Sequence, residues 1–138
     1  MRKYFIETSV FIRFFTKDDA HKFEDCEKLF DLIEKGLVKS YSSNVVIQEI
    51  FYVLTKTYGF NKTEVLEDIK IILKLRNMTL IETTDTPKAL EFFEKYNIKF
   101  GDCFIASQLP YGTNLVTYDK DFSKIKSLEV VTPKEVTS

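Results

Sequence analysis

The chain has 138 residues, of which 44% are hydrophobic and 30% are charged, and its formal net charge is −1. This length fits one domain spanning residues 1–138, and the composition is ordinary for a globular protein. Because the net charge is close to zero, it does not indicate nucleic-acid binding. Local basic side chains or a metal would have to hold a polyanion.

The first elements in the chain are an apolar strand and two helices. We expect a buried strand at residues 3–7, a helix at residues 10–15 and a longer helix at residues 22–34. Thr8 or Ser9 is expected to cap the first of these helices. Gly36 supplies a stop for the second, and another strand follows at residues 38–42.

The rest of the chain continues this alternation of strands and helices. Further strands are expected at residues 78–82, 114–117 and 128–131. Further helices are expected from residue 43 or 44 to about 58, from 61 or 63 onward, over 87–96 and from just after Gly101 to about 110. Alternating elements predict a three-layer α/β/α fold with a central parallel sheet of about five strands. Ligands of such sheets bind beyond the carboxyl ends of the strands.

Carboxylates stand at the ends or borders of the apolar segments. Glu7 follows the first strand, Glu49 borders the apolar side of its helix, and Asp102 begins an apolar helical face. Asp119 and Asp121 follow the strand at residues 114–117. No histidine or cysteine accompanies these acids, and carboxylates alone suit a hard divalent cation such as Mg²⁺ or Mn²⁺. The sequence therefore predicts an acidic pocket that folding assembles from distant segments.

Each of these acids also has an ordinary structural explanation. Glu7 fits a polar exit from a strand, and Glu49 fits a boundary residue that reaches water. Asp102 fits a first-turn acid favoured by the helix dipole. Aspartate is frequent in turns such as the one at residues 119–121. The pocket hypothesis therefore depends on the acids as a set.

The sequence offers no signal for export or for a membrane. The two cysteines, Cys26 and Cys103, match neither a disulfide framework nor a zinc site. The apolar start of the chain is too short for a signal peptide, and no run approaches the roughly 20 apolar residues of a membrane helix. We expect a cytoplasmic protein without a membrane partner.

Four motifs in a fixed order resemble those of the PIN domain, in particular the small nucleases typified by VapC toxins. The motifs are Phe5–Ile12, Gln48–Ile50, Phe100–Ala106 and Leu115–Phe122. The first resembles the family's opening strand, acid and apolar helix, and the second its glutamate on a helix. The last two resemble its third and fourth acidic motifs, and the likeness covers essentially the whole chain.

This resemblance implies an endoribonuclease that hydrolyses RNA phosphodiester bonds with Mg²⁺ or Mn²⁺. It assigns metal ligands to Glu7, Glu49, Asp102 and Asp119, with Asp121 as a further catalytic candidate. It also implies supporting roles for Thr8, Ser9 and Thr117, and contacts with RNA phosphate for Arg13, Lys99 and Lys120. A homodimer and an antitoxin protein are implied as partners, and the apolar helices at residues 10–15 and 45–54 offer surface for such interfaces.

One position departs from the family pattern, because the first acid is nearly always aspartate and is Glu7 here. The extra methylene displaces the carboxylate in a site where Mg²⁺ requires nearly ideal octahedral ligands. We therefore expect impaired cleavage, and faster cleavage by Glu7→Asp. The alternative hypothesis is a binding module that holds RNA or an antitoxin without cleaving. A haloacid-dehalogenase-type phosphatase is disfavoured because Ser9 stands where that class has its second aspartate. A receiver domain is disfavoured because this chain has no aspartate to accept a phosphoryl group after the strand at 78–82.

Overall fold

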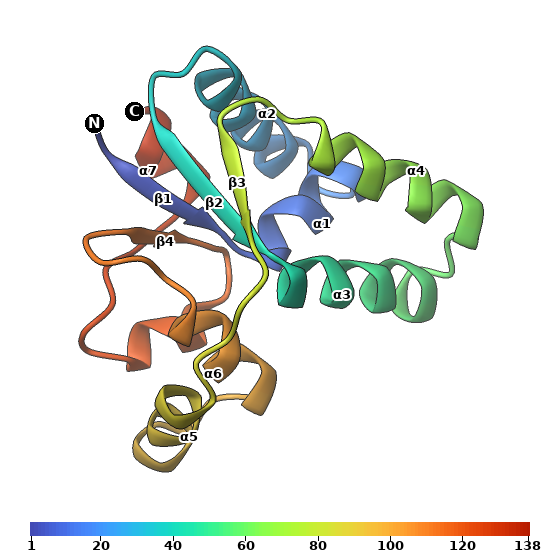
Figure 1. Cartoon of the computed structure of the whole chain (residues 1–138). Helices are drawn as coiled ribbons and strands as arrows, with labels where there is room; N and C mark the ends of the chain where they lie inside the picture. Colours follow the sequence, from blue (N-terminus) through green and yellow to red (C-terminus); the bar gives the residue numbers. More distant parts are fainter.

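Five parallel strands form the centre of the protein in this computed structural model, which describes all 138 residues (Figure 1). The strands are β1 (Lys3–Ile6), β2 (Lys39–Ser43), β3 (Met78–Ile81), β4 (Asn114–Val116) and β5 (Val130–Val131). They are hydrogen-bonded in the order β3-β2-β1-β4-β5, and all four pairs are parallel. The predicted parallel sheet is therefore confirmed.

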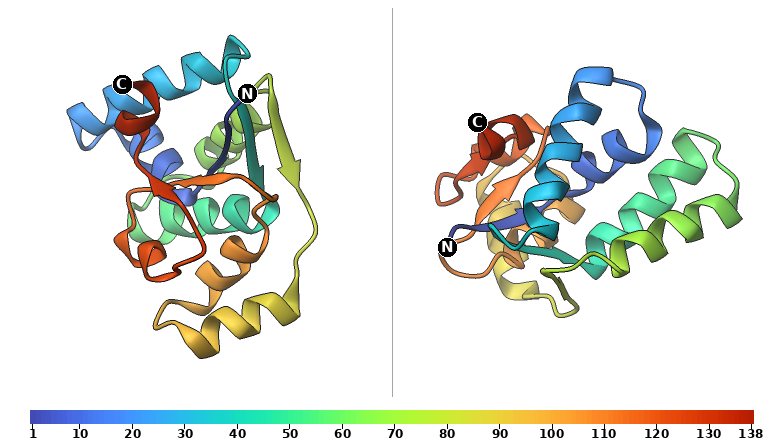
Figure 2. Two further views of the ribbon diagram at one scale, coloured as in Figure 1. Left: turned by 90° about the vertical axis from the view of Figure 1, so that its left-hand side faces the viewer. Right: turned by 90° about the horizontal axis from the view of Figure 1, so that it is seen from above.

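Helices cover the sheet on both faces, which confirms the three-layer prediction (Figure 2). They are α1 (Thr8–Thr16), α2 (Ala20–Glu34), α3 (Asn44–Tyr52), α4 (Lys62–Leu73), α5 (Thr86–Lys95), α6 (Phe100–Ser107) and α7 (Pro133–Thr137). Two short elements are also present, the π-helix η1 (Val53–Thr57) and the 3₁₀-helix η2 (Lys120–Lys124). None of the helices combines the length and apolar character needed to cross a bilayer.

The helices differ from the sequence predictions in three respects. Glu7, rather than Thr8 or Ser9, caps α1, because its carboxylate accepts a hydrogen bond from the Ser9 backbone N–H. The helix that begins at Asn44 reaches Thr57 and is capped by Tyr58, close to the predicted end, but it has π-helical geometry over Val53–Thr57. The elements η2 and α7 were not predicted, because both are only five residues long.

The hydrophobic core holds the strands and the inner helices together. Its main cluster contains 21 buried residues, including Phe5 of β1, Leu115 of β4 and Ile50 of α3, all with 0% exposure. A smaller cluster of six buried residues includes Phe92 of α5, Cys103 of α6 and Ile125. Burial of this apolar surface fixes the ends of β1 and β4 relative to α3 and α6.

The topology creates a crevice between β1 and β4. From β1 the chain crosses to β2 and then to β3 in one direction, and from β3 it returns to β4 on the far side of β1. Since crossovers of parallel strands are right-handed, α1 to α4 and the pair α5 and α6 lie on opposite faces (Figure 1). Such a change of direction is where open α/β sheets bind ligands.

Candidate metal and nucleic-acid site

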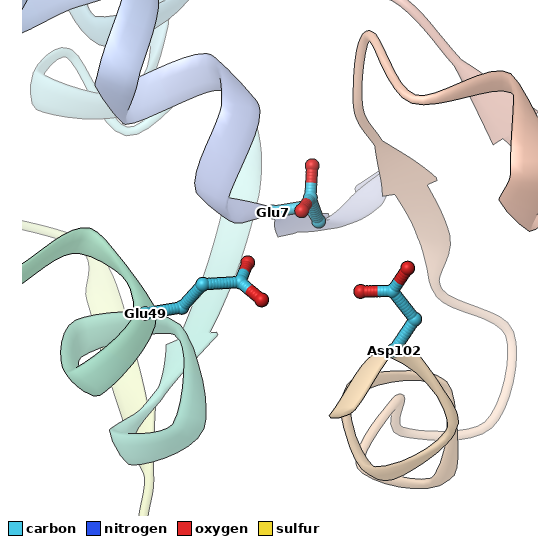
Figure 3. Close-up of side chains that lie close together, drawn as sticks. All are labelled: Glu7, Glu49 and Asp102. Carbon is cyan, nitrogen blue, oxygen red and sulfur yellow. The ribbon is translucent and has the colours of Figure 1, made fainter. Parts of the chain in front are cut away.

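Three carboxylates from distant parts of the chain meet in this crevice. Glu7 follows β1, Glu49 lies on α3 and Asp102 lies in the first turn of α6. Each offers one carboxylate oxygen within 4.8 Å of the others, and their side chains point toward one another (Figure 3). Glu7 and Asp102 are each only 3% exposed, and Glu49 is half-buried. The predicted pocket therefore contains these three acids as neighbours.

The position of Glu7 follows from the register of β1 and β4. Ile6 lies opposite Val116, so Glu7 and Thr117 leave the sheet side by side, and the Glu7 N–H donates to the Val116 carbonyl at 3.0 Å. Glu7 Oε1 accepts hydrogen bonds from Ser9 N (3.0 Å), Ser9 Oγ (2.7 Å) and Thr117 Oγ1 (2.5 Å). All of these donors contact Oε1, so Oε2 is left for a ligand in the pocket.

Asp102 carries a buried oxygen that the protein does not satisfy. Its Oδ2 is buried and has no hydrogen-bond partner. Burial, together with the charges of Glu49 and Glu7, raises the pKa of Asp102 to about 7. Burial also raises the pKa of Glu7, although hydrogen bonds from Thr117 and Ser9 oppose that effect. Crowded, partly desolvated carboxylates are costly without a counter-charge, and their donor set fits a divalent cation.

Asp119 and Asp121 occupy different positions although they are two residues apart. Asp119 lines the same pocket, and its Oδ1 caps η2 by accepting from the Asp121 N–H at 2.9 Å. The Asp121 side chain forms an ion pair with Lys124 at 3.2 Å and does not line the pocket. The structure thus brings four of the five predicted acids to one pocket and leaves Asp121 outside it.

The pocket is an open hollow of about 260 Å³ with basic groups among its acidic lining. Thr8, Ser9, Arg13 and Lys99 contribute to this lining. Thr117 lies behind Glu7, and the hydroxyl of Thr8 is buried without a partner. Lys120 does not line this pocket, but lines a neighbouring hollow that it shares with Asp119 and Thr117.

The sequence analysis missed Tyr58 and Asp18 near this site. Tyr58 lines the pocket, and its hydroxyl donates to Asp18 at 3.1 Å. On a regular helix, the nine positions from Glu49 to Tyr58 would place the two side chains on opposite faces at about 100° per residue. Only the π-helical turn brings Tyr58 back toward the pocket, and no sequence signal marked that turn.

The Thr117 hydroxyl should contribute measurably to stability. It donates to Glu7 and accepts from the Asp119 N–H at 2.9 Å, and its residue is 2% exposed. We expect Thr117→Val to lower the free energy of unfolding by about 2 kcal/mol, since the valine removes one of the three donors to Glu7 Oε1 and leaves the Asp119 N–H unpaired. Urea denaturation measures this change. Thr113→Val is the matched control, because the buried Thr113 hydroxyl has no partner and its loss should cost almost nothing. Equal effects of the two variants would contradict the role of Thr117.

Comparisons with known proteins place these features in a family. The PIN domain family model matches residues 4–128. None of the curated protein sequences matches this chain. Among solved structures, VapBC2 of Rickettsia felis, bound to a promoter DNA fragment, is similar with a TM-score of 0.68 and 20% identity, over 94% of this chain and 98% of that chain.

Two further solved structures have the same fold. VapC20 of Mycobacterium tuberculosis, a toxin that cleaves the sarcin-ricin loop, has a TM-score of 0.69 and 19% identity, over 87% of this chain and 92% of that chain. VapBC-1 of nontypeable Haemophilus influenzae has a TM-score of 0.64 and 14% identity, over 95% of this chain and 98% of that chain. These similarities show the fold, and the family model matches most of the sequence. The chain belongs to the PIN domain family.

Proposed function

We propose that this protein is an endoribonuclease that requires Mg²⁺ or Mn²⁺ and acts as the toxin of a toxin–antitoxin pair. The observation that carries the proposal is the convergence of Glu7, Glu49 and Asp102 within 4.8 Å. The unpartnered Oδ2 of Asp102 adds to it, because a cation would satisfy that oxygen. Membership of the PIN domain family supports nuclease chemistry at this position.

The three carboxylates and Asp119 would hold the cation. A divalent ion held there would supply activation of water and neutralisation of the charge that develops on the phosphate during hydrolysis. Ser9 and Thr117 orient the Glu7 carboxylate through hydrogen bonds to Oε1. Thr8 lies beside Glu7 in the lining of the pocket, and its buried hydroxyl has no hydrogen-bond partner.

The pocket's basic groups favour a nucleic-acid strand as the substrate. An acidic pocket repels a polyanion unless a cation and nearby basic side chains attract it. Arg13 and Lys99 both line the pocket and are placed to contact phosphates of the strand. The similar VapC20 cleaves an RNA loop, which supports RNA over DNA as the substrate of this protein.

A cleavage assay with defined metals tests this function. The purified chain should cleave a labelled single-stranded RNA in Mg²⁺ or Mn²⁺ and not in EDTA. Lys99→Ala should raise KM for the RNA. Lys74→Ala should not, because Lys74 is exposed and lies outside the pocket lining. Products should be absent with a DNA of the same sequence. Binding of RNA without any metal-dependent product would instead favour a module that does not cleave.

Metal binding should depend on pH through Asp102. Its pKa of about 7 means that a proton and the cation compete for the same carboxylate. As the pH falls below about 7, we expect the affinity for Mn²⁺ to fall by up to about tenfold per pH unit, and above that pH it should level off. Calorimetric titration with MnCl₂ across this range measures the dependence. An affinity that is constant from about pH 5.5 to 8 would contradict the assignment of Asp102 as a ligand.

Two apolar surfaces support the proposed protein partners. A narrow hollow is lined only by apolar residues of α1, α2 and the region around the end of α4, and it fits an apolar antitoxin segment. A second apolar surface, on α5 and α6, is suited to a homodimer. It consists of Leu90, Phe93 and Phe100, which are 44%, 49% and 47% exposed. Light scattering after gel filtration tests the dimer, which Phe93→Lys should dissociate. Inhibition of cleavage by the product of a neighbouring short reading frame tests the antitoxin.

A further inference from the structure

Arg13 is held at the edge of the pocket by one of its nitrogens. Its Nη1 donates to both carboxylate oxygens of Asp18, each at 3.0 Å. Asp18 follows α1, while Arg13 lies in the last turn of that helix. Both side chains are about one-third exposed, so this ion pair alone contributes little to stability. Its arrangement therefore calls for an explanation other than stability.

Two more groups fix Asp18 in place. Thr16 Oγ1 donates to Asp18 Oδ1 at 2.8 Å, and the Tyr58 hydroxyl donates to Oδ2 at 3.1 Å. Together with Arg13, these donors lower the pKa of Asp18, and the hydrogen bond from Thr16 is the largest cause. An exposed carboxylate with donors from three side chains is held more firmly than a typical surface acid.

The π-helix η1 is what delivers Tyr58 to Asp18. The Tyr58 N–H donates to the Val53 carbonyl at 3.1 Å, five positions back, which is the π-helical pattern. Val53 lies one α-helical turn after Glu49, and all three residues line the pocket. Turns of this type are uncommon and occur frequently at functional sites. The same irregular helix thus presents a carboxylate to the acidic cluster and a hydroxyl to Asp18.

The guanidinium of Arg13 keeps its other donors free. Arginine carries five N–H groups in a rigid fork. Asp18 engages only Nη1, and neither Nη2 nor Nε forms a hydrogen bond within the chain. A phosphate is bound best by two parallel N–H groups from one edge of the fork. The edge formed by Nε and Nη2 is available for such a bond.

We infer that Asp18, Thr16 and Tyr58 are positioning residues that hold Arg13 by Nη1, so that its free edge binds a phosphate of the RNA strand at the pocket. This inference rests on the proposed function and adds the residues that set how the strand is held. Preorganisation is the reason for the arrangement, since an arginine fixed before binding loses less conformational freedom when RNA arrives. Asp18 acts only through Arg13, so removing it should weaken substrate binding despite removing a negative charge.

Steady-state cleavage of a labelled single-stranded RNA tests this inference. Arg13→Ala should raise KM by about tenfold or more, because a charge-assisted bidentate contact is lost, and should change kcat much less. Asp18→Ala should raise KM by a smaller factor, about three- to tenfold, and Tyr58→Phe by less again. The salt dependence of RNA affinity should become flatter by about 0.7 in logarithmic slope for Arg13→Ala, which corresponds to one phosphate contact.

A double substitution separates positioning from simple charge repulsion. In Arg13→Ala, the further change Asp18→Ala should leave KM unchanged, since the residue that it positions is gone. Asp31→Ala is the matched control. Asp31 also pairs with a basic residue, Lys35, at 2.7 Å, and it lies outside the pocket lining. Its replacement by alanine changes the net charge of the protein by the same amount as Asp18→Ala. It should leave KM unchanged.

Each contrary result has a distinct meaning. Tighter RNA binding by Asp18→Ala, or additive effects of the two alanines, would show that Asp18 repels RNA and does not position Arg13. An unchanged KM in Arg13→Ala would show that this arginine contacts no phosphate. Either result overturns the inference and leaves the nuclease standing. No metal-dependent cleavage by the unsubstituted chain would overturn the proposed function, and the inference with it.

Discussion

Asp102→Asn should abolish cleavage and at the same time stabilise the metal-free protein. The asparagine removes the charge that would hold the cation, and we expect cleavage to fall by more than about 100-fold, since even groups behind a metal ligand contribute 10- to 100-fold. In EDTA the same change relieves the repulsion among Asp102, Glu49 and Glu7. Cleavage rates and thermal unfolding in EDTA measure the two effects.

The stabilisation should itself depend on pH. The folded pKa of Asp102 is about 7, above its ordinary value of 3.8, so the folded state binds more protons than the unfolded state between these values. The metal-free protein therefore loses stability from Asp102 as the pH rises through this window. Asp102→Asn should not change the free energy of unfolding below about pH 4, and it should give its full stabilisation above about pH 7. Each 1 kcal/mol of added unfolding free energy should raise Tm by about 4 °C.

Asp68→Asn provides the control for this pair of effects. Partial burial and Glu64 also raise the pKa of Asp68, but this residue lies on α4 and not in the pocket lining. It should give a small stabilisation and unchanged cleavage. A chain that still cleaves after Asp102→Asn, or one that Asp102→Asn destabilises at high pH, would contradict the role of Asp102 as a crowded metal ligand.

The fold and the acidic cluster were predictable because their signals are local. Each apolar strand ends at a polar residue within a few positions, and a parallel sheet gathers such ends at one edge. This is why Glu7 and Asp119 were assigned to a common pocket. Asp102 was recognised because it begins an apolar helical face, and Glu49 because it borders one. None of these inferences required knowledge of side-chain conformation.

The details that escaped prediction depend on contacts between distant segments. Glu7 caps α1 with the same oxygen that accepts from Thr117, which is 110 positions away in the sequence. Asp119 and Asp121 look equivalent in the sequence, yet capping of η2 turns only Asp119 to the pocket. Tyr58 reaches the site through a π-helical turn whose residues carry no distinctive pattern. Tertiary packing decided each of these outcomes.

Substitutions of Glu7 should separate the charge of this carboxylate from its reach. Glu7→Gln can keep the hydrogen bonds at Oε1 from Ser9 and Thr117, but it presents an amide instead of a carboxylate oxygen to the pocket. We expect cleavage to fall by more than about 100-fold with the fold retained. Single-turnover cleavage measures the loss, and thermal unfolding verifies the fold.

Glu7→Asp should act in the opposite direction and cleave faster than the unsubstituted chain. Aspartate is a better helix N-cap than glutamate and can keep the bond to the Ser9 N–H. Its shorter side chain also removes the methylene that displaces the carboxylate in a site where Mg²⁺ requires nearly ideal octahedral ligands. Full activity in Glu7→Gln would show that Glu7 caps α1 without serving the chemistry, and slower cleavage by Glu7→Asp would show that glutamate is the better ligand in this pocket.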